Sequence, residues 1–321
     1  MKNKDLKSLK NKRNEFVSKH ILLFVIIGIG LILSLMSEHF LTVSNFINIA
    51  RQISINFILA AGLTMVIITG GIDLSVGSIV ALSGVVAGIY LNTGGNFIIA
   101  ILLALLIGTI CGFINGILVA KFKMASFIAT LGMMSMARGL ALVITEGSSI
   151  TISNSNYTFI GGGYIFGIPM PVIVAAIIFI VVYLILNKTR LGRTFFAIGG
   201  NEEASRLSGI KVANKYLIVY SISGLLAGLA SVVLTARLWA APPIAGQGFE
   251  LHAIAASVIG GASLMGGTGT ILGTLYGAFI IGIIRNGLNL IGVASFWQQF
   301  VIGLIIILAV LFDRIRKNRM A

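Results

Sequence analysis

Residues 97–119 read FIIAILLALLIGTICGFINGILV and contain no charged side chain. A helix needs about 20 apolar residues to cross the hydrocarbon core of a bilayer. Lipid offers no hydrogen-bond partners to the backbone, so a lone spanning segment of this kind is helical. Comparable runs lie at 21–37, 52–70, 74–92, 97–119, 126–145, 170–186, 216–236, 251–265, 269–291 and 295–312. The sequence therefore predicts an all-α, polytopic integral membrane protein with about ten transmembrane helices.

The composition agrees with this architecture, because 57% of the residues are hydrophobic, 10% are charged and the mean hydropathy is +1.05. One of the ten runs is compatible with two different structures. Residues 251–265 are short and rich in glycine, so the alternatives there are a full crossing and a broken or re-entrant segment. The run that starts at residue 21 is followed by no small-residue cleavage site, so we expect an uncleaved first span.

The segments outside the spans define the domain organisation. We predict a basic cytoplasmic tail at 1–20, a single transmembrane domain at 21–312 and a second basic tail at 313–321. Two long loops interrupt the transmembrane domain. The outer loop, 146–169, is rich in Ser, Asn, Thr and Gly, and we expect it to be irregular. The inner loop, 187–215, is the larger soluble surface on the cytoplasmic side.

The basic residues set the orientation. With the N-terminus in the cytoplasm, nineteen of the 23 Lys and Arg residues fall in cytoplasmic loops and tails, as the positive-inside rule requires. Ten spans also return the basic C-terminus to that side. The basic residues that give the net charge of +14 thus lie in loops and tails beside apolar spans. We therefore do not expect nucleic acid as a partner.

Several motifs for chemistry are missing from the sequence. It contains no G-x-x-x-x-G-K-[ST] motif, so the chain does not hold its own phosphate-cradling loop. The three histidines are too scattered to form a metal cluster, and no span carries paired carboxylates for a proton relay. We therefore expect no catalysis and no metal or cofactor in this chain.

The stretch TGGIDLSVGS, at 69–78, is the most distinctive polar segment between two spans. The double glycine ends one helix, and Asp73 can cap the next by accepting hydrogen bonds from the amides near Ser75 and Val76. A second interpretation is a broken helix whose polar groups line a path through the membrane. Both interpretations can hold together.

The inner loop contains a short punctuated helix within GGNEEASRLSGI, at 199–210. Asn201 is a suitable N-cap, Glu202 and Glu203 favour the positive end of the helix dipole, and Gly209 suits the C′ position. The alternatives are a plain connecting helix and a helix that docks into a partner protein.

The polar residues within the later spans are also candidates. Arg138 and Arg285 lie inside apolar runs, where a charge is costly and faces a cavity, a partner or the interface. Asn286 and Asn289 are three residues apart and share one helical face.

Several of these motifs together resemble the permeases of bacterial ABC importers for ribose and related monosaccharides. The resemblance runs from about residue 45 to the C-terminus. The motifs that carry it are GLTMVI at 62–67, TGGIDLSVGS at 69–78, GGNEEASRLSGI at 199–210, GQGFEL at 246–251, AIAASVIGGASLMGGTGT at 253–270 and NGLNL at 286–290.

The resemblance implies a set of partners. It implies a multi-pass subunit of the bacterial inner membrane, surrounded by lipid, that forms a homodimer or a pseudo-symmetric heterodimer with a second permease. It also implies separate cytoplasmic ATPase subunits, which hold ATP and Mg, and an extracytoplasmic sugar-binding protein.

The same resemblance assigns roles to residues. The helix that docks into the ATPase would comprise Asn201, Glu202, Glu203, Ala204, Arg206, Leu207 and Gly209. We assign to the translocation path or its gate Gly70, Gly71, Asp73, Ser75, Asn115, Glu250, His252, Arg285, Asn286 and Asn289.

The chain departs from the sugar-permease pattern at two positions. His252 stands where these permeases commonly carry Asp, and Arg285 stands where Asn commonly precedes Asn286. These differences put ribose itself in doubt. The solutes left open are a modified, phosphorylated or acidic sugar, a polyol and a furanose-like signalling molecule.

Two rival functions remain from the sequence alone. An ion-coupled secondary sugar transporter or facilitator would need a membrane carboxylate, for which Asp73 is the candidate. A membrane scaffold or sensory subunit would move no solute at all.

Overall fold

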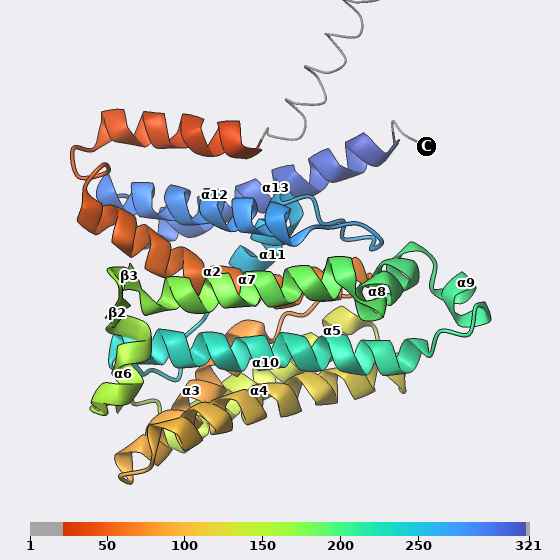
Figure 1. The fold of residues 1–321 in the computed structure, drawn as a ribbon, viewed down its shortest axis with the longest axis horizontal. Helices are drawn as coiled ribbons and strands as arrows, with labels where there is room; N and C mark the ends of the chain where they lie inside the picture. Colours follow the sequence, from red (N-terminus) through yellow and green to blue (C-terminus); the bar gives the residue numbers. More distant parts are fainter. Residues whose placement is uncertain (1–21, 319–321) are drawn as a thin grey trace, which may run out of the picture.

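The computed structural model describes the backbone of residues 22–318. The side chains that it leaves out within this range belong to residues 295, 309, 310 and 312–318. The predicted tail 1–20 lies outside the described residues, and so does the end of the predicted tail 313–321, from 319 onward. In the described part, most helices run along the long axis of the molecule (Figure 1).

The elements follow one another with short connections. The helices are Leu22–Met36, α2 (Val43–Ile68), α3 (Val76–Asn92), α4 (Phe97–Ala120), α5 (Ser126–Thr145), α6 (Ser155–Gly162), α7 (Met170–Lys188), α8 (Arg190–Gly200), α9 (Glu202–Leu207), α10 (Val212–Leu238), α11 (Phe249–Ile259), α12 (Ile271–Leu290) and α13 (Ser295–Asn318). Two antiparallel pairs of two-residue strands complete the structure, β1 (Ile150–Thr151) with β4 (Ala240–Ala241) and β2 (Tyr164–Ile165) with β3 (Ile168–Pro169).

The all-α prediction is confirmed. Among the described residues, six helices are long and apolar enough to cross a membrane: α2, α4, α5, α7, α10 and α12. The other predicted spans correspond to shorter apolar helices, namely Leu22–Met36, α3, α11 and the Phe296–Leu308 part of α13. Each predicted run is thus an apolar helix, although the short ones do not meet the length for a full crossing on their own.

The segment 251–265 has the broken form. Its helix, α11, is Phe249–Ile259, and 260–270 follow without helix. At about 1.5 Å per residue, eleven residues extend only about half of the 30 Å hydrocarbon core. Gly260 and Gly261 end the helix, since Gly261 adopts a φ of +90° that side chains disfavour.

Other boundaries differ from the prediction as well. α2 begins at Val43 and not at 52, because the Thr42 hydroxyl caps the helix by accepting a hydrogen bond from the Asn45 amide (3.3 Å). The outer loop is more ordered than expected. It contains α6, which Asn154 caps, and the buried Tyr157 hydroxyl pairs with Thr235 Oγ1 of α10 at 2.9 Å.

α2 lies at the centre of the bundle, where it packs against α7, α10, α11 and α12. α4 and α10 make the closest helix pair, because glycines face one another. A Cβ on Gly112 would lie 2.2 Å from the Tyr220 carbonyl oxygen, and one on Gly224 would lie 2.1 Å from the Gly108 carbonyl oxygen. Small residues that let backbones approach are the usual means of helix association in membranes.

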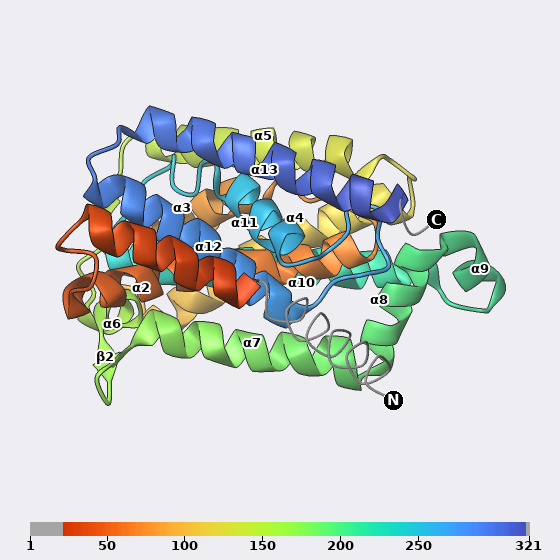
Figure 2. The same cartoon turned by 90° about the horizontal axis from the view of Figure 1, so that it is seen from above.

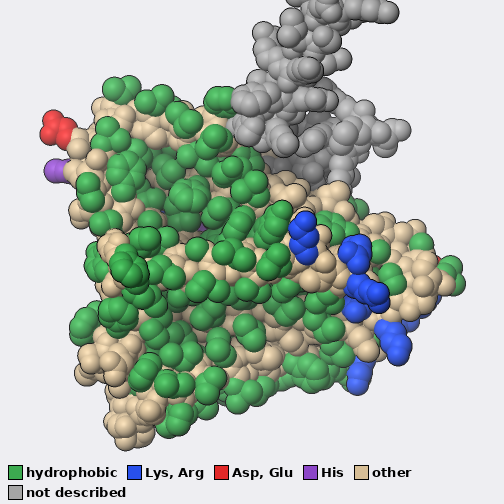
Figure 3. All heavy atoms as spheres, viewed as in Figure 1, with side chains coloured by type: hydrophobic (Ala, Val, Ile, Leu, Met, Phe, Trp, Pro, Cys, Tyr) green, Lys and Arg blue, Asp and Glu red, His purple; other side chains and the backbone are tan. Residues whose placement is uncertain are grey.

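The two ends of the bundle differ in chemistry. α9 projects beyond the bundle at one end, and β2, β3 and α6 lie at the other (Figures 1 and 2). Lys and Arg side chains gather around α8 and α9, whereas hydrophobic side chains cover most of the bundle on the same face (Figure 3). The end that carries α8 and α9 is the one that the predicted orientation would place in the cytoplasm.

Candidate functional site

The chain is not helical at 69–75, between α2 and α3. Gly70 has a φ of +83°, which ends α2, and a Cβ on Gly71 would lie 2.4 Å from the Tyr220 hydroxyl oxygen. Glycine is therefore required at both positions by conformation or by space. The double glycine identified in the sequence does break the helix.

Asp73 is fully buried at the end of this break. Its Oδ1 accepts hydrogen bonds from the Ser75 amide (3.0 Å) and the Ser75 hydroxyl (2.6 Å), and its Oδ2 accepts one from the Ser223 hydroxyl of α10 (2.9 Å). Asn115 of α4 donates in turn to Ser75 Oγ (2.9 Å). A buried carboxylate needs such donors, so this network joins the break to α4 and α10.

α5 holds the same segment from another side. The Ser126 hydroxyl accepts a hydrogen bond from the Ile72 amide, and the Thr130 hydroxyl accepts one from the Leu74 amide, each at 3.1 Å. Backbone groups inside a membrane protein must find partners within the protein. The break is consequently a structured element held by three helices.

The break also contacts α8 and the loop after α11. A Cβ on Gly199, in the last turn of α8, would lie 1.8 Å from the Ile68 carbonyl oxygen and 2.4 Å from the Gly267 amide nitrogen. Gly267, in turn, donates to Ile68 O (2.9 Å). The end of α8, the end of α2 and the loop after α11 therefore meet backbone to backbone.

The predicted helix in the inner loop is present as α9. Asn201 Oδ1 accepts from the Ala204 amide (2.8 Å), and Gly209 follows the helix with a φ of +82°. Glu203 forms an ion pair with Arg206, whose hydrogen bond and charge lower the pKa of the Glu203 carboxyl.

A cavity of about 590 Å³ lies between α9 and the helix break. Gly70 and Gly71 line it together with the α9 residues Glu202, Glu203 and Arg206. The structure thus brings the predicted docking helix and the predicted gate glycines to one cavity.

Glu250 lies apart from these residues, beside Arg138 of α5. Arg138 donates to the carbonyl oxygens of Pro243 (2.7 Å) and Ala245 (2.9 Å). The two charged residues line a cavity of about 580 Å³ with Ser135 and Gln247. Arg138 is therefore bonded to a loop and faces a cavity that Glu250 also lines, as expected for a cation within an apolar span.

Three other predicted residues meet at a third cavity, which is polar and has a volume of about 390 Å³. His252 of α11 and Arg285 and Asn289 of α12 line it, and α13 closes it. Asn286, which was also assigned to the translocation path, does not line this cavity. Asn286 exchanges hydrogen bonds with Asn45 of α2, at 2.8 and 3.1 Å, and lines none of the polar cavities described above.

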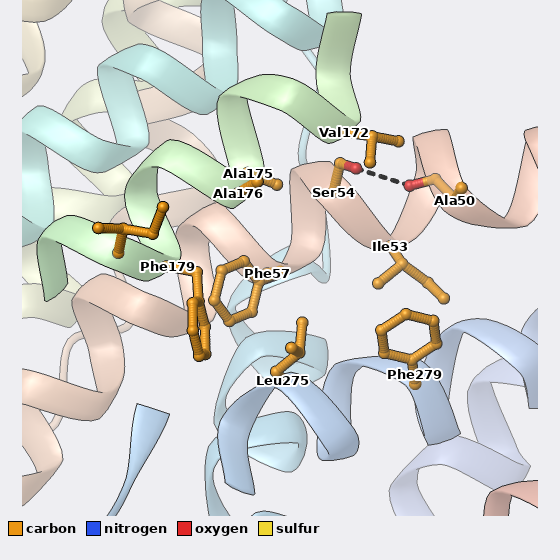
Figure 4. Close-up of a pocket in the computed structure, with 11 residues that line it drawn as sticks. Ala50, Ile53, Ser54, Phe57, Val172, Ala175, Ala176, Phe179, Leu275 and Phe279 are labelled. Carbon is orange, nitrogen blue, oxygen red and sulfur yellow. Dashed lines mark hydrogen bonds between the residues drawn. The ribbon is translucent and has the colours of Figure 1, made fainter. Parts of the chain in front are cut away.

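One apolar cavity, of about 320 Å³, lies between α2, α7 and α12 (Figure 4). Phe57, Phe179 and Phe279 line it, and the hydroxyl of Ser54 donates to the Ala50 carbonyl (2.7 Å). A sugar needs several hydrogen-bond partners in its site, so this cavity suits an acyl chain or apolar side chains instead.

The part of the chain that the structure describes contains no group of three or more His, Cys, Asp or Glu side chains able to hold a metal ion.

The sequence analysis missed several residues that hold the candidate gate. Ser126, Thr130 and Ser223 bond to the break, and Gly199 contacts it, yet a lone serine, threonine or glycine in an apolar run carries no sequence signal of its own. Only the tertiary pairing identifies them.

Comparisons with known proteins place these features in a family. The family model described as "branched-chain amino acid transport system / permease component" matches residues 45–310. No solved structure matches the chain.

Relatives cover nearly the whole chain. The ribose import permease protein of Bacillus subtilis is 49% identical over 91% of this chain and 90% of its own length. The D-allose transport system permease protein of Escherichia coli is 42% identical over 88% and 87%. The L-arabinose ABC transporter permease protein of Azospirillum brasilense is 35% identical over 95% and 90%. With a helical membrane bundle and a family match over most of its length, the chain belongs to this family of transport-system permease components.

Proposed function

We propose that this chain is the membrane subunit of an ABC importer that passes a monosaccharide, or a related polyol or sugar derivative, across the bacterial inner membrane. The named substrates of its relatives are ribose, D-allose and L-arabinose, which are all aldoses. Like those permeases, the chain is a transport subunit and not an enzyme, and ATP hydrolysis resides in a separate protein.

The single observation that carries the proposal is α9. This helix projects from the basic end of the bundle (Figures 1 and 2), and Leu207 at its end is 80% exposed. A large, exposed apolar side chain on a projecting helix that also carries charged residues suits insertion into a groove of a partner. We assign the partner as the ATPase, with ATP and Mg²⁺ bound there, because the sequence contains no phosphate-binding loop.

The orientation follows from the basic end. Lys121, Lys123, Lys188, Arg190 and Arg193 are all exposed around α8 and α9 (Figure 3), and α13 also ends on that side (Figure 2). The positive-inside rule then supports cytoplasmic termini. The extracytoplasmic sugar-binding protein would dock on the opposite end, which carries α6, β2 and β3.

Coupling would pass through the contact of backbones at Gly199. A shift of α9 moves α8, and α8 has no free space against Ile68 and Gly267. The helix break at 69–75 begins at the same point, so we infer that ATP-driven motion reaches Asp73 and its partners directly. Packed elements that touch without voids transmit such displacements.

A second permease copy, identical or homologous, would cover α5. Gly132 and Gly139 have open space where a Cβ would stand, and Ser135 is exposed between them. The cavity of Arg138 and Glu250 opens on the same helix. Polar groups facing lipid are costly, so a protein partner on this face is favoured over acyl chains.

The proposal is tested by ATPase capture and ATP-driven uptake. After mild crosslinking in native membranes, the wild-type chain should retain an ATPase, and Leu207→Asp should lose it. Phe166→Asp is the matched control, since Phe166 is fully exposed between β2 and β3, at the other end of the molecule.

Uptake decides between the rival mechanisms. Proteoliposomes that contain the complex should accumulate an aldose only with ATP and should ignore an ionophore. Uptake that continues without ATP and collapses with the ionophore would reject the importer in favour of an ion-coupled transporter.

A further inference from the structure

The polar cavity between α11, α12 and α13 is lined by one arginine, one histidine and several neutral amides. Its volume is about 390 Å³, and its polar side chains are Gln247, His252, Arg285, Asn289, Gln298 and Gln299. Four of these are neutral amides, one is an arginine, and the lining includes no Asp or Glu. The cavity therefore carries positive charge and many hydrogen-bonding groups.

Arg285 has no partner of its own. None of the described residues accepts a hydrogen bond or an ion pair from its guanidinium. The carboxylate of α11, Glu250, points toward α3, because a Cβ on Gly77 of α3 would lie 2.3 Å from its Oε2. An arginine within a membrane domain needs a counter-charge or an acceptor, and the described residues supply neither here.

The groups near Arg285 also provide no negative charge, and some of them lack hydrogen-bond partners themselves. The Arg285 charge acts on the His252 ring, and Arg237 of α10 is repelled by both Arg51 and Arg285. His252 Nδ1 is buried without a hydrogen-bond partner. Gln298 donates to Asn289 Oδ1 (2.7 Å), which leaves the Asn289 NH₂ group without an acceptor among the described residues.

We propose that this cavity binds an oxyanion, a carboxylate or phosphate, carried by a small polyhydroxylated solute such as a sugar acid or a sugar phosphate. Arginine presents a planar fork of donors that matches both oxyanions. The amides and His252 supply donors and acceptors for hydroxyl groups, and the volume lies within the range of small-molecule sites. The inference rests on the proposed function insofar as it takes the ligand to be the class of solute transported.

Binding to the full-length chain in phosphatidylcholine nanodiscs tests the proposal by calorimetry, with D-gluconate, ribose 5-phosphate and ribose as probes. We expect at least one anion to bind about tenfold or more tightly than ribose, since a charged hydrogen bond is worth at least that much. Arg285→Asn should remove this preference, and Arg285→Lys, which keeps the charge, should retain part of it.

Arg237→Gln is the matched control, because Arg237 is a half-buried arginine that feels the same field but does not line the cavity. It should change anion affinity less than about threefold, as a long-range charge does. Equal binding of ribose and the anions, unchanged in Arg285→Asn, would overturn the proposal. So would Arg285-dependent binding of phosphatidylglycerol with no binding of either solute anion, which would make the ligand a lipid headgroup.

These outcomes are separate from those of the importer test. ATP-driven uptake of an aldose together with no anion binding would keep the proposed function and reject the cavity. Anion binding in nanodiscs without ATP-driven uptake would keep the cavity and reject the importer.

Discussion

Asp73 connects more parts of the molecule than any other residue of the candidate path. Its two oxygens accept hydrogen bonds from Ser75 and Ser223, and Asn115 extends the network to α4. Ser75 and Ser223 are buried, so their donors would lose an acceptor in a non-polar surrounding if the carboxylate were removed. Asp73 therefore acts first to hold the helix break in place through hydrogen bonds.

Asp73→Ala should lower the stability of the bundle by about 3 kcal/mol, because buried hydroxyls and an amide lose a charged acceptor. Transport should fall with it. Asp73→Asn keeps the shape and one acceptor oxygen and should lie between Ala and wild type. Thermal unfolding in detergent and uptake in proteoliposomes measure the two effects. Wild-type melting and wild-type uptake for Asp73→Ala would contradict this role.

Residue types alone predicted part of this site. The sequence predicted that Asp73 accepts hydrogen bonds from the amides near Ser75 and Val76, and the Ser75 amide does donate to it. It could not assign Ser223, which is 150 residues away. It also grouped Asn286 with Asn289 from their spacing, whereas Asn286 faces α2 and bonds Asn45. Spacing fixes a helical face only approximately, and the neighbouring helix decides what each residue meets.

At the scale of elements, α9 combines exposure with charge. Arg206→Glu should uncouple ATP hydrolysis from uptake, because it places a third negative charge beside Glu202 and Glu203 on the docking surface. The variant should fold normally, since both side chains of the Arg206–Glu203 pair are exposed and such surface pairs add little stability. The ratio of solute transported to ATP hydrolysed is the measurement. An unchanged ratio would show that the helix connects and does not couple.

The contact between α8 and α2 gives a sharper test of transmission. Gly199→Ala should impair coupling, because the added methyl group would lie 1.8 Å from the Ile68 carbonyl oxygen and must push α8 away. Gly200→Ala is a control at the next position, where a Cβ has open space. ATPase activity stimulated by the solute should fall in the first variant only. Equal activity in both would rule out this contact as the route.

Element boundaries were predicted less well than the presence of the elements. The hydropathy of each span identified a helix, because lipid permits few alternatives. Hydropathy does not detect helix caps. The predicted run therefore began at 52, whereas α2 begins at Val43, after its cap at Thr42. The outer loop was predicted to be irregular, yet burial of Tyr157 against α10 stabilises α6 there. A short helix that depends on tertiary contact leaves a weak pattern in the sequence.

At the scale of the whole molecule, one set of glycines packs helices together within the bundle, and another set lies on the face of α5 where we propose that a second copy packs. Gly112→Leu should destabilise the bundle by about 3 kcal/mol or more, because its side chain would enter the Tyr220 backbone. Gly132→Leu, on the open face of α5, should leave the monomer's melting unchanged and weaken the proposed dimer. Thermal unfolding and mass measurement in detergent separate the two effects. A dimer that survives Gly132→Leu would exclude this face of α5.

The buried carboxylate also has a consequence for synthesis. Asp73 emerges from the ribosome 150 residues before Ser223, a delay of roughly 8 to 30 s at usual elongation rates. During that time Asp73 stands just before α3, whose 17 residues are too few to cross a bilayer alone. Ser75 can already donate to Oδ1, but the Ser223 hydroxyl of α10, which donates to Oδ2, is still missing. A nascent chain that stops before α10 therefore leaves one oxygen of this carboxylate without its donor, and we expect it to be less stable than the finished bundle.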